Sequence, residues 1–185
     1  MAKPHLETAH AFWKDLVTPS DTVIDATCGN GYDTLLLSQL AEKVYSIDIQ
    51  QQAITSAQSK LTEELRKKVV FLHCCHSLFP AEIRPASVKL IVYNLGYLPG
   101  GNKSQTTQVE TTLLSLNRAL SLVQPGGAVS ITCYPGHAEG KREEEAIQEW
   151  IASLDSKWTF QHHRWLSRLH APSLIIITEM QPKAD

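Results

Sequence analysis

The stretch Asp25-Ala26-Thr27-Cys28-Gly29-Asn30-Gly31 decides the fold of this chain. The β-branched run of residues 22–27 predicts a buried strand that ends inside this stretch, and residues 34–40 after it have helical character. Glycines at such a junction allow a tight turn and let a ligand approach the backbone closely. The stretch therefore predicts a strand, a ligand-binding loop and a helix in succession.

The same alternation continues along the chain. Strands are predicted at residues 22–27, 43–48, 69–73, 88–93, 128–133 and 174–178, and helices at residues 4–16, 34–40, 51–65 and 107–123. Strands that alternate with helices predict an α/β, Rossmann-like fold with a mostly parallel sheet and helices on both faces. The segments 158–165 and 173–180 have no long helix between them, which predicts an antiparallel hairpin at one edge of the sheet.

Composition limits the class of protein. The 185 residues include 17 Lys and Arg against 19 Asp and Glu, a formal net charge of −2 that disfavours a protein coating nucleic acid but leaves room for a small basic patch. We expect one domain over residues 1–185, with an N-terminal helical segment at 1–20 and a Rossmann-like core at 21–185. The four cysteines do not form a disulfide scaffold, and no signal peptide or membrane span is recognisable, so we expect a cytoplasmic protein with no membrane partner. A homodimer stays open.

The glycine loop predicts a particular kind of ligand. A dinucleotide site would place a third glycine three residues after Gly31, but position 34 is Thr. Asp25 would repel a phosphate and suits a ligand amine, while Asp48 at the next strand end can accept hydrogen bonds from two ribose hydroxyls. A nucleoside with an amine and no phosphate is S-adenosylmethionine. The alternative is a glycine-rich turn with a capping Asp.

Three motifs together resemble one family of class I S-adenosylmethionine-dependent methyltransferases. They are the stretch from Asp25 to Gly31, the segment Asn94-Leu95-Gly96-Tyr97-Leu98-Pro99-Gly100-Gly101-Asn102-Lys103, and Tyr134-Pro135-Gly136-His137. The family was first labelled as rRNA methylases, and its members are associated with methylating the aminomethyl group of 5-aminomethyl-2-thiouridine at the tRNA wobble position. The resemblance implies a seven-stranded sheet, with S-adenosylmethionine across the ends of the first two strands and a tRNA anticodon loop as partner.

The expected cofactor-binding residues follow from this placement, and all lie at strand ends or in the loops after them. They are Asp25, Thr27, Cys28, Gly29, Asn30, Gly31, Asp48, Ile49, His76, Ser77 and Asn94. The run His73-Cys74-Cys75-His76 looks like a metal cluster, but neighbours in a strand point to opposite faces and no second pair stands at zinc-ligand spacing. We therefore expect no metal, and place His76 and Ser77 beside the adenine.

Asn94, Tyr97 and His137 are the expected catalytic residues. The spacing Asn-x-x-Tyr is similar to the Asn-Pro-Pro-Tyr loop of methyltransferases that act on amino groups, in which the Asn oxygen accepts a hydrogen bond from the amine and the ring packs on the base. His137 could take a proton from an ammonium substrate or contact RNA. Alternatively, Asn94 caps a turn, Tyr97 packs in the core and His137 is a surface residue.

RNA contacts are expected from side chains around the same crevice and near the C-terminus. They are Lys103, Tyr134, Lys141, Arg142 and Arg164. Each has a second interpretation, because Lys103 could lie in a solvated loop and the acidic run after Arg142 could mark only a well-capped helix. Two competing functions also stay open: a methyltransferase for rRNA or a small-molecule amine, and a nucleoside-binding module without enzymatic activity.

Overall fold

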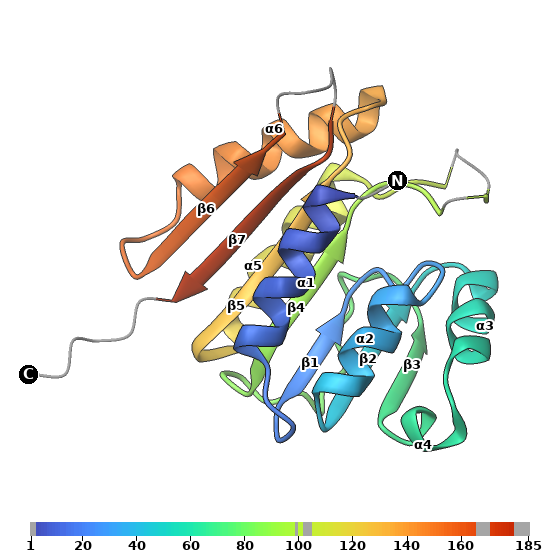
Figure 1. Cartoon of the computed structure of the whole chain (residues 1–185). Coiled ribbons are helices and arrows are strands. Elements are labelled where there is room, and N and C mark those ends of the chain that lie inside the picture. Colours follow the sequence, from blue (N-terminus) through green and yellow to red (C-terminus); the bar gives the residue numbers. More distant parts are fainter. Residues whose placement is uncertain (1–2, 99, 102–104, 166–170, 180–185) are drawn as a thin grey trace, which may run out of the picture.

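One mixed sheet forms the centre of the molecule (Figure 1). The computed structural model describes residues 3–98, 100–101, 105–165 and 171–179. In these parts of the chain, seven strands pair in the order β3-β2-β1-β4-β5-β7-β6. They are β1 (Thr22–Asp25), β2 (Lys43–Asp48), β3 (Val69–His73), β4 (Val88–Asn94), β5 (Val123–Cys133), β6 (Trp158–Arg164) and β7 (Ser173–Glu179). β1 to β5 are parallel, whereas β7 runs antiparallel to β5 and β6, which confirms the predicted sheet with its antiparallel edge pair.

Helices cover both faces of this sheet. They are α1 (Pro4–Leu16), α2 (Tyr32–Leu40), α3 (Gln51–Lys60), α4 (Glu63–Arg66), α5 (Val109–Leu122) and α6 (Ala138–Ala152). Side chains of β4 alternate between two cores: Leu90 and Val92 join the core under α1 and α2, and Ile91 and Tyr93 join the core under α5 and α6. Residues that alternate in this way are buried on both faces, which explains the nearly continuous apolar character of the strands.

The order of the strands places a crevice at one end of the sheet. From β1 the chain proceeds outward through β2 to β3 on one side, and then returns to add β4 and β5 on the other side of β1. Ligands of open α/β sheets bind outside the carboxyl ends of the strands where this order reverses. The reversal lies between β1 and β4, so the loops that follow Asp25 and Asn94 meet there.

Some boundaries differ from those predicted. The helix predicted at 51–65 is two helices, because the chain leaves the helical conformation at Leu61 and restarts after Thr62, whose hydroxyl accepts a hydrogen bond from Leu65 N–H at 3.3 Å. β1 ends at Asp25 rather than at residue 27. β5 begins at Val123, earlier than residue 128, with an irregular pairing opposite the start of β4.

The N-terminal helix packs against the sheet at the crevice end. α1 lies across β4, β5 and β7, as Figure 1 shows, and its Ala9 and Trp13 are buried in the core beneath it. This packing fixes the orientation of the helix, and the residues on its N-terminal half, Leu6 and His10, line the crevice. None of the helices in the described ranges is long and apolar enough to cross a membrane.

Candidate active site

A cavity of about 870 Å³ occupies the crevice beyond β1, β2 and β4. Of the expected site residues, those that line it are Thr27, Cys28, Gly29, Asn30, Gly31, Asp48, Ile49, His76, Asn94, Tyr97, Tyr134 and His137. The loops after all five parallel strands and the start of α1 thus converge on one space. Its volume is in the range of small-molecule sites.

The glycine loop forms one wall of the cavity. Gly29 and Gly31 have φ values of +50° and +80°, a region that residues with a Cβ adopt only at a cost. A Cβ on Gly31 would lie 2.4 Å from the Cα of Ala57, so this glycine also lets α2 approach α3 closely. The backbone at Gly29 and Gly31 is therefore free of side chains because the turn, and at Gly31 also the helix packing, require glycine.

Asp48 connects this loop to the end of β2. Its Oδ2 accepts a hydrogen bond from Gly29 N–H at 2.9 Å, and its Oδ1 accepts one from Gln50 N–H at 2.8 Å. Burial raises the pKa of this carboxyl, while the two backbone donors act in the opposite direction. A carboxylate has lone pairs beyond those two bonds, so Asp48 can also accept hydrogen bonds from the hydroxyls of a nucleoside.

Asp25 does not lie where the sequence led us to expect. It is fully buried beneath the loop, where it accepts hydrogen bonds from Thr34 Oγ1 at 2.6 Å and from Thr27 N–H at 3.3 Å, and it does not line the cavity. Burial is the main reason that its pKa rises to about 7, with the nearby charge of Asp33 adding to the effect. The expected contact between Asp25 and a ligand amine is therefore corrected: Asp25 shapes the loop from below, whereas Asp33 and Asp48 are the acidic residues of this region that line the cavity.

Two hydrogen bonds hold Asn94 in place. Its backbone N–H donates to Thr27 Oγ1 at 2.7 Å, and its side-chain Nδ2 donates to Asp33 Oδ2 at 2.5 Å. The other Asp33 oxygen contacts His10 Nε2 at 2.6 Å. Within the described residues, Asn94 Oδ1 is buried without a hydrogen-bond partner. A buried acceptor that lacks a partner costs free energy, and on a cavity wall it is a position that a ligand donor can complete.

Tyr97 lies on the loop after Asn94, and this loop is supported from behind. Thr107 Oγ1 accepts a hydrogen bond from Gly96 N–H at 2.8 Å and donates to Glu143 Oε2 at 2.7 Å. Thr112 donates to the other Glu143 oxygen at 2.6 Å. Glu143 is thus a buried carboxylate whose pKa is raised by burial and lowered by the two hydroxyls. Sequence reasoning took the acidic run that contains it as a helix-capping signal only.

His137 begins α6 as its N-cap. Its Nδ1 accepts a hydrogen bond from Gly140 N–H at 3.1 Å, so in the neutral imidazole the proton lies on Nε2. Nε2 is buried without a partner in the described part of the chain and lies near Gly96, while the ring is 5.5 Å from that of Tyr97. This tautomer makes His137 Nε2 a hydrogen-bond donor towards the cavity. Nε2 could accept a proton there, as the sequence led us to expect, only if Nδ1 carried the proton and lost its hydrogen bond from Gly140 N–H.

The region after β3 contributes to the far side of the cavity. Burial lowers the pKa of His76 to about 4, so its imidazole is neutral at neutral pH. Ile49 lines the cavity and is 65% exposed, which leaves an apolar surface for a flat ring. Ser77 does not line the cavity, because its hydroxyl is buried and points to Cys75 Sγ at 3.1 Å. In the described segments, no group of three or more His, Cys, Asp or Glu could hold a metal ion.

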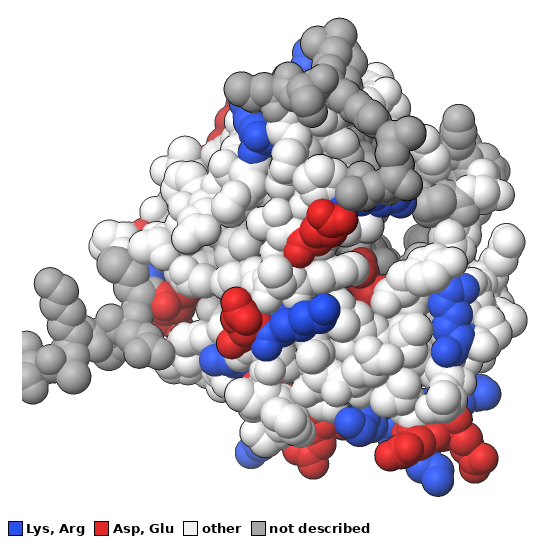
Figure 2. Space-filling model, viewed as in Figure 1, with Lys and Arg blue, Asp and Glu red and all other residues white. Residues whose placement is uncertain are grey.

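Three of the cationic residues expected to contact RNA, Lys141, Arg142 and Arg164, do not line the cavity. Arg142 pairs with Glu139 at 2.9 Å and Lys141 with Glu145 at 3.8 Å, both along the surface of α6. Arg164 lies 4.0 Å from Glu144, and Lys103 lies outside the described residues. On the face drawn in Figure 2, basic and acidic side chains are interspersed. Lys3 is the described cationic residue on the cavity wall, and sequence reasoning did not single it out.

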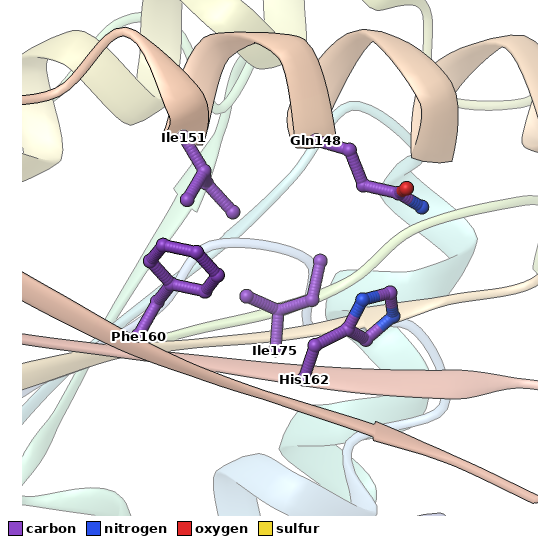
Figure 3. A pocket seen from close by; sticks show the side chains of 5 residues that line it. All are labelled: Gln148, Ile151, Phe160, His162 and Ile175. Atoms are coloured by element: carbon purple, nitrogen blue, oxygen red, sulfur yellow. The ribbon is translucent and has the colours of Figure 1, made fainter.

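A second, smaller cavity lies between α6 and the β6–β7 pair (Figure 3). It measures about 160 Å³ and is lined by Gln148, Ile151, Phe160, His162 and Ile175. The two cavities share no lining residue, and none of the expected site residues contributes to the smaller one. The chemistry expected from the sequence therefore belongs to the large cavity alone.

Comparisons with known proteins connect this site to one family. Residues 44–179 match the family model described as "Putative rRNA methylase". A relative from Arabidopsis thaliana, named tRNA (mnm(5)s(2)U34)-methyltransferase, chloroplastic, is 39% identical over 95% of this chain and 69% of its own length.

Two crystal structures have the same fold throughout. One is of an rRNA methylase, so described, from Clostridium thermocellum: it has a TM-score of 0.91 and 34% identity, and the match covers 97% of this chain and 100% of that one. The other is of a methyltransferase, so described, from Streptococcus mutans in complex with SAH. It has a TM-score of 0.86 and 33% identity over 97% of this chain and 100% of that one.

Proposed function

The chain belongs to the rRNA methylase family, and from this premise we propose that it is an S-adenosylmethionine-dependent methyltransferase that modifies tRNA. The proposed reaction methylates the amine nitrogen of a 5-aminomethyl-2-thiouridine at the wobble position. The name of the Arabidopsis thaliana relative supports this choice, since its mnm(5)s(2)U34 is the methylated form of that nucleoside. The observation that carries the proposal is the buried Oδ1 of Asn94 on the cavity wall, which has no hydrogen-bond partner among the described residues.

The residues around the glycine loop fit the cofactor. Asp48 would accept hydrogen bonds from the ribose hydroxyls, Ile49 and His76 would flank the adenine, and the backbone at Gly29 and Gly31 would accommodate the methionine part. The Streptococcus mutans relative, which binds SAH (S-adenosylhomocysteine, the cofactor without its methyl group), supports this assignment. S-adenosylmethionine supplies a methyl group on a sulfonium, which is a strong electrophile.

Asn94 would orient the nucleophile. A primary amine must be neutral to attack, and its lone pair must lie in line with the bond that breaks. When Asn94 Oδ1 accepts one amine N–H, the rotation of the amine is restricted and the lone pair is directed to the methyl carbon. A carbon–nitrogen bond forms as the carbon–sulfur bond breaks, its electron pair stays on sulfur, and the methylated amine releases a proton to solvent.

Tyr97 and His137 would hold the base. The exposed side of Tyr97 offers an aromatic face for stacking of an unstacked nucleotide, which is how proteins commonly bind bases of RNA loops. His137 carries its proton on Nε2 and would donate a hydrogen bond to an oxygen of the base or backbone. Tyr134 lines the same side of the cavity. A single nucleotide held in this way agrees with the small number of cations on the cavity wall.

The test is transfer of labelled methyl from S-adenosylmethionine to three kinds of acceptor. Bulk tRNA with unmethylated aminomethyl groups should take up label, while rRNA and free small-molecule amines should not. Asn94→Ala should reduce turnover about 10²-fold, because the amine is no longer oriented, and should still bind SAH. Asn117→Ala removes an exposed Asn from α5 and serves as the matched control with unchanged turnover.

Each outcome separates the proposal from its competitors. Label in rRNA or in a small amine, with none in tRNA, would reject the tRNA substrate and support the methyltransferase of that other class. Full activity in Asn94→Ala would reject the role of the side chain. SAH binding without transfer to any acceptor would favour a nucleoside-binding module.

A further inference from the structure

We propose that Asp33 is a positioning residue that fixes the side-chain amide of Asn94, and that His10 of the N-terminal helix in turn fixes Asp33. The inference rests on the proposed function, since it explains how Asn94 is made ready to bind an amine. It assigns a role in the reaction to α1, which packs on the sheet and reaches the cavity with its N-terminal half. The three residues come from α1, α2 and the end of β4.

The first step concerns the two ends of the Asn94 amide. An amide carries a donor NH₂ at one end and an acceptor oxygen at the other, and the two ends have nearly the same shape. Asp33 Oδ2 lies 2.5 Å from Asn94 Nδ2, and an ionised carboxylate only accepts hydrogen bonds. Flipping the amide would place oxygen against oxygen. Asp33 therefore selects the orientation in which Oδ1, which has no partner in the described ranges, stays available for a ligand donor.

Asp33 lies at the N-terminus of a helix, beside the cavity. It lies in the first turn of α2, where the backbone N–H groups of the helix favour a negative charge. Its side chain retains 13% exposure, and it lines the cavity beside Asn94. Asp25, which is close in sequence, is buried beneath the loop and cannot make this contact. A hydrogen-bond acceptor at this position is what the selection of the amide orientation requires.

His10 occupies the remaining oxygen of Asp33. Its Nε2 lies 2.6 Å from Oδ1 and donates the hydrogen bond, since the carboxylate accepts. The imidazole ring packs against Trp13, with ring centroids 4.9 Å apart, and Trp13 is 1% exposed. Core packing of α1 thus holds His10, His10 holds Asp33, and Asp33 holds Asn94.

This chain of contacts makes a specific kinetic prediction. Loss of Asp33 leaves the amide free to present either end, so the chemical step slows while SAH and tRNA still bind. Turnover number should fall about 10²-fold, as for other small misplacements of a reacting group, with KM for tRNA and the affinity for SAH changed less than threefold. A purely structural role for Asp33 would instead lower the thermal stability and the affinity for SAH together.

The experiment exchanges the two side chains. Asp33→Leu removes the acceptor, and Asn94→Asp places two carboxylates in contact, so both variants should lose about 10²-fold in turnover. The double variant Asp33→Asn with Asn94→Asp restores a donor facing a carboxylate and leaves one carboxylate oxygen for the amine. The turnover number of this double variant should be at least tenfold higher than that of Asn94→Asp alone. Asp33→Asn alone can still accept from Asn94 Nδ2, so it should retain turnover within about tenfold of the unmodified protein.

Controls keep the outcomes distinct. Asp15→Leu, at an exposed position of α1, should leave turnover unchanged. His10→Phe keeps a ring against Trp13 but removes the hydrogen bond, and should lower turnover by a smaller factor than Asp33→Leu. SAH titration calorimetry and thermal unfolding of every variant provide readouts that do not depend on turnover.

Two results would overturn the inference. If Asp33→Asn is as inactive as Asp33→Leu, the charge of Asp33 acts directly on the substrate and not through Asn94. If the double variant is no better than Asn94→Asp although it binds SAH, the two side chains do not act as a pair. If the unmodified protein does not methylate tRNA at all, it is the proposed function that fails.

Discussion

Replacing Gly31 with Ala should strain the glycine loop in two separable ways. The residue has a φ of +80°, and an L-residue in the left-handed region costs about 1–2 kcal/mol. The new Cβ would also lie 2.4 Å from Ala57 Cα and 2.5 Å from Ala57 Cβ, whereas carbon atoms prefer about 3.5–4.0 Å. α3 would have to withdraw by about 1 Å, and overpacking of this kind costs about 1–3 kcal/mol. The free energy of unfolding should therefore fall by about 2–5 kcal/mol.

Gly100 provides the matched control for this prediction. It has a φ of +84°, and a Cβ there would meet no atom of the described part of the chain within 4 Å. Gly100→Ala should thus lower the free energy of unfolding only by the cost of the left-handed backbone conformation, about 1–2 kcal/mol. Urea unfolding of both variants measures the difference, and SAH calorimetry should show a weaker affinity for Gly31→Ala because the loop moves with α2. Equal destabilisation of the two variants, with unchanged SAH affinity, would refute the close approach of α2 to α3.

Three further predictions concern buried side chains. Burial raises the pKa of Asp25 from 3.8 to about 7, so between these pH values the folded state binds more protons than the unfolded state. The free energy of unfolding should therefore fall as the pH rises through this interval. Urea unfolding at several pH values should show that Asp25→Asn removes this part of the pH dependence. Glu143→Gln should lower the free energy of unfolding by about 1–3 kcal/mol, because an amide cannot accept both Thr hydroxyl bonds as the carboxylate does. It should also slow turnover, since these bonds support the loop that contains Gly96. The control Glu149→Gln, on the exposed side of α6, should change neither quantity. His137→Asn keeps an N-cap and should leave urea stability within about 0.5 kcal/mol, but should raise KM for tRNA; an unchanged KM would argue against the Nε2 donor.

The strands and the glycine loop were predictable because their signals are local. β2 and β3 have the predicted bounds, and α1 runs from Pro4 to Leu16 as its pattern indicates. The break in the helix predicted at 51–65 was missed, because the apolar pattern continues across Leu61 while the Thr62 cap interrupts the backbone. Patterns of hydrophobicity report which face is buried more clearly than where a helix ends.

The site was predictable in outline and less so in detail. The sequence predicts acidic residues around the loop, but the loop conformation decides which carboxylate lines the cavity, and it buries Asp25 and places Asp33 on the wall. His10 is 23 positions away from its partner Asp33 in the sequence, and Glu143 is 36 positions away from its partner Thr107. Contacts of that separation leave no periodic signal in one sequence. The tautomer of His137 likewise depends on an N-cap bond that a residue type alone does not reveal.

Locating the transferred methyl group tests the central claim most directly. Purified protein is incubated with S-adenosylmethionine and tRNA that carries unmethylated aminomethyl groups at the wobble uridine, and the digested nucleosides are then analysed by mass spectrometry. We predict that 5-aminomethyl-2-thiouridine is converted to its methylaminomethyl form and that all other nucleosides stay unchanged. An unconverted wobble nucleoside, in a preparation shown to bind SAH, would contradict the account.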